Sequence, residues 1–479
     1  METIHRWNNS DSYKYEVVKG HIVSAIESGA LLPGDRVPSL RDMSKKSQMS
    51  ISTVMKAYFE LEIEGRLESR PQSGFYVRTY SRGISAPQIS TPELKPTRLD
   101  SFQFQINVLN AMAVANIVPL GAAVPSPDLL PVAELTRLFR QTVNAHENAY
   151  GYEEIQGNRK LRAQIAYHML EAGISAHLDD VIVTNGGTEA LYLTLSTLVG
   201  PGDTVAVESP CYFGYLHILE TLGINVLEIP THPETGIKIE ALRQAIDSYE
   251  IKVCILQPNF NNPFGCLTPD ARKNEIAELL SSRNISLIED DIVGDLSFSG
   301  ARPHAITACS NKIDSFYISS FSKTLAPGFR IGWIYSRNRR DELLKRKMGV
   351  SMNTNRPAQL TLEAYLSAGR YGKHLKNYAS QCKKQVGLVT AAVAKYFPEN
   401  TRLTRPEGGF LLWVVLGEDI NTDIFYSKAL ADGIGIAPGS IFTSQKRYRN
   451  CFRLSCTHPY SNKIDRALQR LGELAQESG

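Results

Sequence analysis

The sequence predicts an α/β protein in which a small helical module precedes a larger α/β body. Near the N-terminus, apolar residues recur at helical spacing and are followed by two short strand-like runs. From about residue 179 onward, apolar β-branched runs alternate with helix-like segments, a pattern typical of a mainly parallel sheet covered by helices. A proline-bearing stretch separates the two parts, so we expect a multidomain chain.

Composition limits the classes of protein that fit. The chain has 479 residues, and at about 100–200 residues per domain two to four domains are expected. The net charge of +3 is too small to indicate a nucleic-acid partner by itself. Seven scattered cysteines contain no CxxC pair, which argues against a disulfide framework or a metal site. No apolar run approaches the roughly 18 residues that span a bilayer, so we expect a soluble, cytoplasmic protein without a membrane partner.

Three helices are predicted in the N-terminal module. Tyr15, Val18, Ile22 and Ile26 recur at helical spacing and indicate the first helix. Ser39 can cap a second helix that runs to about residue 46. A third helix follows, and either of two serines, at positions 50 and 52, can cap it.

A hairpin is predicted directly after these helices. Residues 66–69 and 75–77 are β-like and are joined by a turn rich in glycine, proline and serine. Three helices and a hairpin suggest a winged helix-turn-helix, whose last helix would enter the major groove of DNA. Residues 36–56 carry five cations and one anion, 5 − 1 = +4, where DNA contact would need positive charge. A small interaction domain with one solvated basic face remains the alternative from pattern alone.

The N-terminal segments also resemble a known family. Residues 32–41, LPGDRVPSLR, and residues 70–77, RPQSGFYV, resemble the winged-helix signature of the GntR family, and the match covers nearly all of residues 11–79. The resemblance implies that residues 1–79 bind double-stranded DNA. Ile51 stands where many relatives carry an arginine, so a different base preference and an apolar contact to a thymine methyl group are expected. The DNA-binding residues implied by the resemblance are Arg41, Ser50, Ser52, Thr53, Lys56, Arg70, Gln72 and Gly74.

A linker is predicted at residues 80–115. Residues 80–100 contain three prolines and several small polar residues without apolar periodicity. Such a segment should be extended and semi-rigid, with a reach on the order of 60–70 Å. The two modules could therefore meet within one chain or across a dimer.

The strand ends of the larger part carry residues that suit pyridoxal phosphate. That cofactor requires a lysine amine, a carboxylate beside its pyridine nitrogen and a cradle for a phosphate dianion. Lys323 and Asp290 each follow a strand-like run, and residues 186–188 lie between a strand and a helix, where backbone N–H groups can hold phosphate. Taken singly, each feature is more often a surface lysine, a helix cap or a turn. Their joint order along one α/β segment carries the prediction.

Residues 116–475 resemble fold-type I aminotransferases of class I/II. The matching stretches are residues 184–191, 262–265, 289–291 and 322–323. The resemblance implies a PLP-dependent transferase-like domain at residues 116–479, with a large α/β part at about 150–345 and a small α+β part at about 346–479. The cofactor-binding residues that it implies are Lys323, Asp290, Asn262, Tyr212, Gly187, Thr188, Ser320, Ser322, Arg330 and Tyr152.

The same resemblance implies individual roles. Lys323 would be the Schiff-base lysine and Asp290 the pyridinium partner, together the catalytic pair. Asn262 would donate to the phenolate oxygen and Tyr212 would stack on the ring. Arg453 would clamp a substrate carboxylate, as the planar guanidinium allows.

Two further positions bear on assembly and on catalysis. Tyr152 resembles the tyrosine that reaches the cofactor of the neighbouring subunit, which implies a homodimer. Many relatives carry a tyrosine three residues after the pyridinium aspartate, and here that residue is Val293. Losing this donor should shift the imine pKa, so cofactor binding should survive while efficient transamination is in doubt.

The combination of both modules resembles the MocR subfamily of bacterial transcription regulators. It implies a pyridoxal phosphate-binding, DNA-binding regulator whose operator binding is modulated by the cofactor or by a small amine or amino acid. The alternative is a true PLP-dependent aminotransferase acting on an amino acid and a 2-oxo acid, and slow residual transamination is compatible with the regulator. A third alternative is a structural DNA-binding dimer with an empty cofactor fold.

Overall fold

The structure is a computed structural model that describes residues 14–27, 30–31, 34–63, 66–70, 73–78, 84–89, 91–98, 106, 108 and 117–477. The chain divides into two compact units. The first comprises Met1–Gly83 with Val386–Lys395, and the second comprises Ile84–Gln385 with Tyr396–Gly479. The proposed domain boundaries at residues 79, 115 and 345 remain predictions.

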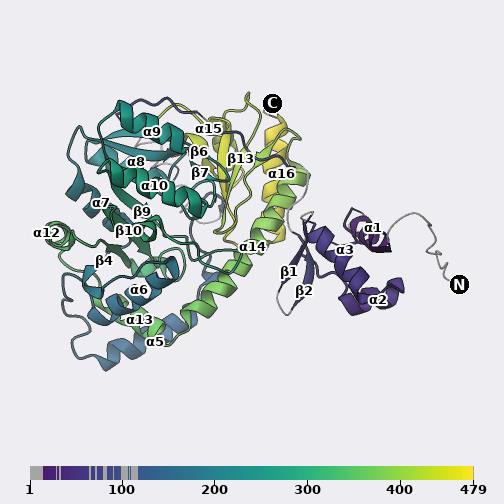
Figure 1. Cartoon of the computed structure of the whole chain (residues 1–479), viewed down its shortest axis with the longest axis horizontal. Coiled ribbons are helices and arrows are strands. Elements are labelled where there is room, and N and C mark those ends of the chain that lie inside the picture. The colour runs from purple at the N-terminus through teal and green to yellow at the C-terminus, as the bar shows by residue number, and fades with distance from the viewer. Residues whose placement is uncertain are drawn as a thin grey trace. The chain divides into compact units, whose positions relative to one another are not determined.

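The described part of the first unit has the three helices and the hairpin that the sequence predicts (Figure 1). Their bounds are α1 (Lys14–Glu27), α2 (Leu40–Ser47), α3 (Ile51–Ile63), β1 (Leu67–Arg70) and β2 (Gly74–Val77).

The helix starts in this unit are fixed by serine side chains. The Ser39 Oγ accepts a hydrogen bond from the Asp42 amide at 3.2 Å, which caps α2 as predicted. The Ser50 Oγ accepts from the Thr53 amide at 3.2 Å, so Ser50 rather than Ser52 caps α3.

One apolar cluster holds the first unit together. Val18 and Ile22 of α1, Tyr58 of α3, and the facing pair Leu67 and Val77 of the hairpin are all buried in it. The Tyr58 hydroxyl donates to the Pro38 carbonyl at 2.9 Å, and burial raises the pKa of that hydroxyl. The core therefore fixes α3 against both α1 and the hairpin.

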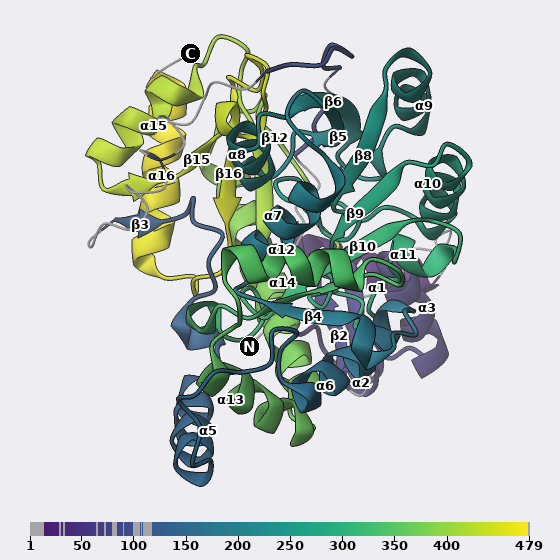
Figure 2. The same ribbon diagram turned by 90° about the vertical axis from the view of Figure 1, so that its left-hand side faces the viewer.

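The described residues of the second unit form an eight-stranded sheet in the order β4-β11-β10-β9-β8-β5-β6-β7 (Figure 2). The central strands β10, β9, β8, β5 and β6 run parallel. β11 and β7 run antiparallel to them at the two sides, and β4 pairs antiparallel with β11, so it runs in the direction of the central strands. The strand bounds are β4 (Val181–Thr184), β5 (Thr204–Ser209), β6 (Asn225–His232), β7 (Gly236–Ile237), β8 (Ile251–Leu256), β9 (Ser286–Asp290), β10 (Ser315–Ser320) and β11 (Gly332–Tyr335). The predicted mainly parallel sheet is confirmed.

The start of β11 follows from the turn before it. Although the run from Arg330 to Ile334 is strand-like in sequence, β11 begins at Gly332. Arg330 ends the short helical turn η4 (Pro327–Phe329) with a left-handed backbone, φ 55°, which an extended strand cannot include.

Helices cover both faces of this sheet because its strands are apolar on both sides. Val205 and Val207 of β5 lie in a cluster with α7 and α8, and the intervening Ala206 lies in a cluster with α9 and α10. Successive strand side chains point to opposite faces, so one strand serves both cores. The helices of this large part are α5 (Val132–Ala145), α6 (Arg159–Met169), α7 (Gly187–Leu198), α8 (Phe213–Thr221), α9 (Ile239–Ser248), α10 (Asp270–Ser282), α11 (Ile306–Cys309), α12 (Arg340–Val350) and α13 (Arg356–Ser367).

A smaller antiparallel sheet follows in the order β12-β13-β16-β15, with α15 and α16 beside it (Figure 1). The short strands β3 and β14 pair in parallel. This pairing joins the first strand of the second unit to a strand near its C-terminal end. The bounds are β3 (Val118–Pro119), α14 (Tyr371–Tyr396), β12 (Arg402–Leu403), β13 (Leu411–Val415), α15 (Thr422–Ala431), β14 (Ile434–Gly435), β15 (Ala437–Pro438), β16 (Cys451–Ser455) and α16 (Asn462–Glu477).

The described part of the predicted linker lies on the second unit. Thr97 exchanges two backbone hydrogen bonds with Val226, at 2.8 and 3.0 Å, and so adds to the edge of β6. Glu93 exchanges two with the Gln445 side chain, at 3.1 and 2.9 Å. These hydrogen bonds hold Glu93 and Thr97 on this surface.

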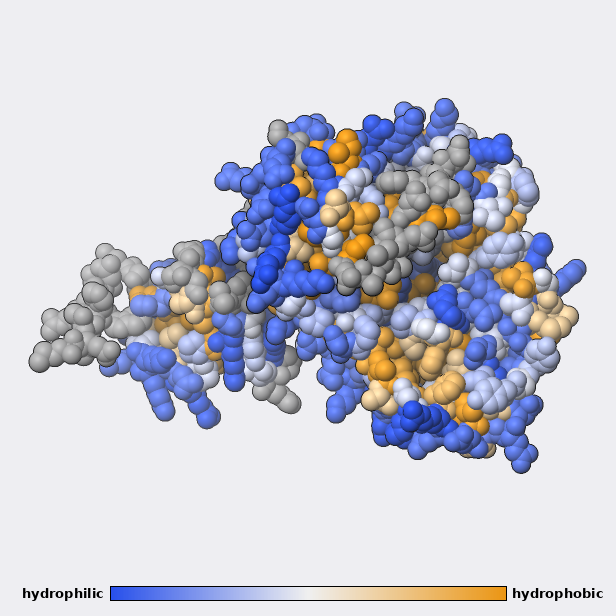
Figure 3. Space-filling view, turned by 180° about the vertical axis from the view of Figure 1, so that it is seen from behind, coloured by the Kyte–Doolittle hydropathy of each residue, from blue (hydrophilic) through white to orange (hydrophobic). Residues whose placement is uncertain are grey.

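The outer surface of the second unit mixes charged side chains with apolar patches on the face that Figure 3 shows. Within the described ranges, no helix combines the length and hydropathy that a membrane span requires.

Candidate functional site

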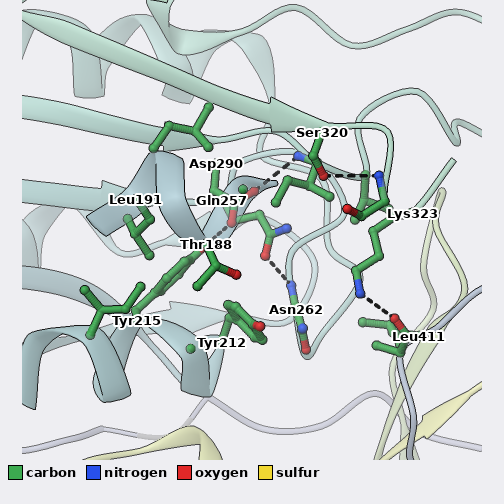
Figure 4. A pocket seen from close by; sticks show the side chains of 18 of the residues that line it. Thr188, Leu191, Tyr212, Tyr215, Gln257, Asn262, Asp290, Ser320, Lys323 and Leu411 are labelled. Carbon is green, nitrogen blue, oxygen red and sulfur yellow. Dashed lines mark hydrogen bonds between the residues drawn. The ribbon is translucent and has the colours of Figure 1, made fainter. Parts of the chain in front are cut away.

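A pocket of about 920 Å³, part of it open to solvent, lies beyond the carboxyl ends of β9 and β10 (Figure 4). The first turn of α7 forms one wall, and the loop after β10, which carries Lys323, forms another. Ligands of open α/β sheets bind at such strand ends.

Lys323 is held inside this pocket by the main chain. Its Nζ donates to the Ala123 carbonyl at 2.6 Å. Burial, and secondarily the charge of Arg453, lowers the pKa of the Lys323 amine to about 8, although Asp290 opposes the shift. Because its pKa is lowered, a fraction of the Lys323 amine is uncharged near neutral pH, and the uncharged amine can attack an aldehyde. This lysine is therefore suited to forming a covalent bond with an aldehyde ligand.

Asp290 ends β9 and is buried in the pocket floor. Its Oδ2 accepts from the Tyr215 hydroxyl at 2.6 Å, and its Oδ1 accepts from the Ile292 amide at 3.2 Å. Burial raises the pKa of this carboxyl to about 6 despite both hydrogen bonds. Its carboxylate makes no ion pair with any described residue. The negative charge of Asp290 is therefore available to pair with a protonated ring nitrogen.

A candidate anion site lies at the first turn of α7. A Cβ atom at Gly186, whose φ is +85°, would lie 2.4 Å from the Arg330 Nη2, and one at Gly187 would lie 2.7 Å from the Ile292 Cδ1. Only glycine leaves this room beside the guanidinium and the helix N-terminus. Helix N–H groups, a cation and hydroxyls together suit a phosphate.

Three further predicted residues of this cradle lie at the same place. Ser320, Ser322 and Thr188 all line the pocket. The Arg330 Nη1 donates to the Ser322 Oγ at 3.2 Å, and the Ser322 amide donates to the Ser320 Oγ at 3.3 Å. The structure thus brings the predicted phosphate ligands together.

Tyr212 lines the opposite side of the pocket, directly before α8. A Cβ atom at Gly214 would lie 2.3 Å from the Tyr212 ring, so the glycine makes room for that ring. The ring also meets Tyr215 edge-on, with centroids 5.4 Å apart. Burial is the main cause that raises the pKa of the Tyr212 hydroxyl. The ring is therefore fixed where a planar ligand could stack.

Asn262 joins the pocket to Arg453. The backbone N–H of Asn262 donates to the Gln257 Oε1 at 2.8 Å. The side-chain Oδ1 of Asn262 accepts from the Arg453 Nη1 at 2.7 Å. The Arg453 Nη2 donates to the Gly121 carbonyl at 2.6 Å. Burial lowers the pKa of this guanidinium to about 10. Its Nε finds no hydrogen-bond partner among the described residues, which suits a carboxylate ligand.

Two predicted positions behave differently. Tyr152 is 84% exposed and does not line the pocket, so its contact with a neighbouring subunit stays a prediction. Val293 is buried in the pocket wall, where it supplies no hydroxyl.

Sequence reasoning missed Tyr215 and Gln257. Both line the pocket, and each holds a residue that was predicted. Tyr215 lies three residues after Tyr212 and so shares its side of the chain, and Gln257 directly follows β8. Helical spacing and the strand-end rule could have found them.

The predicted DNA-binding residues of the first unit lie on or beside α2 and α3. Arg41 is exposed on α2. The Ser50 Oγ lies 2.8 Å from both the Ser52 Oγ and the Thr53 Oγ1, so these hydroxyls form one group at the start of α3. Lys56 is exposed, with its Nζ 4.2 Å from the Tyr15 ring centroid.

The wing residues are held within the hairpin. The Arg70 guanidinium pairs with Glu68 at 2.9 Å and lies 3.9 Å from the Tyr76 ring centroid. Gly74 has a φ of +104°, which favours glycine. Gln72 lies outside the described residues.

Comparisons with known proteins agree across both units. Residues 115–471 match the family model for aminotransferase class I and II, and residues 14–77 match the model for bacterial regulatory proteins of the gntR family. The uncharacterized HTH-type transcriptional regulators YjiR and YdcR of Escherichia coli (strain K12) are 35% and 33% identical to this chain. YjiR aligns over 96% of this chain and 98% of its own length, and YdcR over 97% and 99%.

A solved structure shares the fold of the larger unit. The kynurenine aminotransferase of Pyrococcus horikoshii, crystallised in complex with PMP, superposes with a TM-score of 0.73 at 28% identity. The match covers 78% of this chain and 94% of that one.

Proposed function

This chain belongs to the GntR-type helix-turn-helix transcription regulators fused to an aminotransferase class I and II domain, the MocR-like architecture, and we propose that ligands at its Lys323 pocket control its DNA binding. The observation that carries the proposal is a pocket that gathers Lys323, Asp290 and the predicted phosphate ligands in a chain that also has a DNA-binding module. The pocket fits pyridoxal phosphate, the cofactor expected from the fold.

Each group of the pocket has one task in this proposal. Lys323 would provide the amine, and the negatively charged carboxylate of Asp290 would stabilise a positive charge on the ring nitrogen. Gly187 and Arg330, with their neighbours, hold the phosphate. When bound, pyridoxal phosphate would supply an aldehyde that reacts reversibly with amines.

A small amine or amino acid is the proposed effector. The Arg453 guanidinium, with one N–H left unmatched beside Asn262, supports recognition of a carboxylate. Such a ligand shifts the protein between two conformations only by its differential affinity for them. The operator, the effector and a homodimer that uses Tyr152 across its interface all belong to the proposal, as does action in the cytoplasm at the nucleoid.

The first experiment tests the pocket. The purified chain, mixed with pyridoxal phosphate and then separated from unbound cofactor by gel filtration, should retain an absorption band near the visible edge, and Lys323→Ala should abolish it. Lys345→Ala, at an exposed lysine of α12, is the matched control and should keep the band. An unchanged band in Lys323→Ala would refute the pocket assignment.

The second experiment tests regulation. DNA selection by the purified protein, with and without the cofactor, should enrich two direct or inverted half-sites. The enriched sequences or their affinities should change with the cofactor. Failure to enrich any sequence would count against the regulator, and identical binding in both conditions would count against ligand control.

Catalysis is the second candidate function, because Lys323, Asp290, Asn262 and Arg453 form a nearly complete aminotransferase set. Val293 opposes it, since the pocket wall lacks a hydroxyl at that position. Steady turnover of an amino acid with a 2-oxo acid would favour the enzyme, whereas turnover limited to slow residual rates favours the regulator.

A further inference from the structure

The outward face of α3 is apolar where a solvated helix would be polar. Ile51, Met55 and Phe59 are 47%, 40% and 49% exposed, and their spacing of four residues places them on one face. The opposite face, with Val54 and Tyr58, is buried in the core of the first unit. An exposed apolar face of this kind indicates a contact surface.

Exposed cations lie on α3 and on the preceding helix α2. They are Arg41, Lys45, Lys46 and Lys56. Asp42 is the only anion between residues 36 and 56, and its carboxylate accepts a hydrogen bond from the Ser39 hydroxyl at 2.6 Å. The two glutamates of α3, Glu60 and Glu62, lie toward its C-terminal end. A partner of α2 and the first turns of α3 should therefore combine negative charge with apolar groups. The major groove of DNA meets both demands, since phosphates border it and thymine methyl groups lie within it.

The three apolar side chains are not equivalent. Ile51 is the first residue of α3, and Met55 follows one turn later. Phe59 lies about 12 Å along the axis from Ile51 at 1.5 Å per residue. Its ring meets Phe75 of β2 edge-on, with centroids 6.1 Å apart, so it belongs to the junction of helix and wing. Ile51 and Met55 are thus the pair that can enter a groove with the helix start.

We propose that Ile51 and Met55 read thymine methyl groups in the major groove of the operator half-site, a proposal that rests on the DNA-binding function above. Neither side chain has a hydrogen-bond donor, and the Met55 thioether is only a weak acceptor. Thymine is the base that presents an apolar group in this groove, so an apolar pair can select it without a donor or an acceptor. The hydroxyl of Ser52 and the amine of Lys56, exposed beside the pair, supply polar and phosphate contacts.

The test removes single methyl groups from DNA. In half-sites obtained by selection, each thymine is replaced in turn by deoxyuridine, and affinity for the full chain is measured by fluorescence anisotropy at fixed salt. One or two replacements should weaken binding about fourfold each, the factor that corresponds to exposing one buried CH₂-sized group. Ile51→Ala should abolish the effect at one thymine, and Met55→Ala should abolish it at the other.

Ile424→Ala is the matched control, because Ile424 is 58% exposed on α15 of the other unit. It should leave every methyl effect unchanged. All three substitutions remove exposed side chains, so circular dichroism melts should stay close to that of the parent protein.

Three results would overturn the proposal. Selective DNA binding without any methyl effect would refute methyl reading while leaving the regulator intact. Methyl effects that persist in both Ile51→Ala and Met55→Ala would assign them to other residues. A loss of dimer mass in Ile51→Ala, seen by light scattering without a methyl effect, would assign the face to a second copy of the chain. Absence of all selective DNA binding would instead remove the proposed function itself.

Discussion

The Lys323 pocket and the outward face of α3 present their functional groups in opposite ways. Lys323 and Asp290 are enclosed by packed elements, and burial has moved both pKa values toward neutrality. Ile51 and Lys56 stand in solvent on one short helix. The pocket is built from contacts between distant segments, whereas the face is built from neighbours along the chain.

The difference has a consequence for mutation. A buried polar group depends on its partners, so removing one partner leaves the other without compensation. An exposed side chain on a helix can be removed with little effect on the fold. Substitutions in the pocket should therefore alter ligand binding strongly and through their neighbours, and those on α3 should act locally.

The largest expected effect comes from Asp290→Asn. The change removes the negative charge proposed to face the ring nitrogen, and affinity for pyridoxal phosphate should fall about a hundredfold or more, as for the loss of one member of a buried charge pair. Absorbance titration of the purified protein measures it. Asp341→Asn, at an exposed aspartate of α12, should bind normally, and an affinity within threefold of the parent in Asp290→Asn would contradict the assigned role.

The pH dependence of cofactor uptake should separate a buried lysine from an exposed one. Only the neutral amine reacts, and burial lowers the pKa of Lys323 to about 8. The second-order uptake rate should therefore rise about tenfold per pH unit from pH 6.5 toward 8 and then level off. Stopped-flow absorbance measures the profile. The rate for Nα-acetyl-lysine, whose ε-amine is fully exposed, should keep rising to about pH 10. A protein profile that did the same would show that the pocket leaves the amine unperturbed.

Tyr215→Phe tests whether the pocket acts through neighbours. The change removes the 2.6 Å hydrogen bond to Asp290, which helps to keep that carboxyl ionised. Cofactor affinity should fall about tenfold, as for one hydrogen bond to a charged group. The same titration measures it, with Tyr167→Phe at an exposed tyrosine of α6 as the control. Equal losses in the two variants would remove Tyr215 from the site.

Gln445→Ala tests the linker. Like the pocket, the linker is held by residues that are distant in sequence, because the backbone of Glu93 is hydrogen-bonded to the Gln445 side chain. The change removes the two hydrogen bonds with Glu93. Hydrogen exchange at residues 91–98 should accelerate about fivefold, as for the loss of about 1 kcal/mol of local stability. Mass spectrometry of peptides measures the rate. Gln469→Ala, which removes an exposed side-chain contact on α16, should leave the linker unchanged. Equal exchange in both variants would show that Gln445 does not hold the segment.

Local patterns indicated part of the candidate site, and the other site residues came from the resemblance to aminotransferases. Lys323, Asp290 and Gly187 each follow a strand-like run, and strand ends of a parallel sheet gather at one edge. Ser39 caps its helix as predicted because a cap depends on residues within one turn. Such features could be predicted since their physical causes lie within a few residues of each other.

The partners of these residues could not be predicted in this way. Tyr215 lies 75 residues from Asp290, and Arg453 lies 191 residues from Asn262. The linker was expected to be extended and semi-rigid, but the sequence did not indicate that Thr97 would pair with the edge of β6. The spacing of apolar residues does not indicate which strand edge is left free to pair with another segment. That depends on the order of all the strands in the sheet.

The amino-acid sequence by itself determined that the chain has two modules and that helices and strands form where they were predicted. It also determined that a lysine and an aspartate follow strands of one sheet. Backbone propensity and apolar spacing act over a few residues, so they are legible in a linear chain. Packing alone decided which hydroxyl meets the Asp290 carboxyl, how far burial lowers the pKa of Lys323, and where Glu93 and Thr97 lie. These properties arise from desolvation and from contacts between segments far apart in sequence, and they come into being only when the chain has closed on itself.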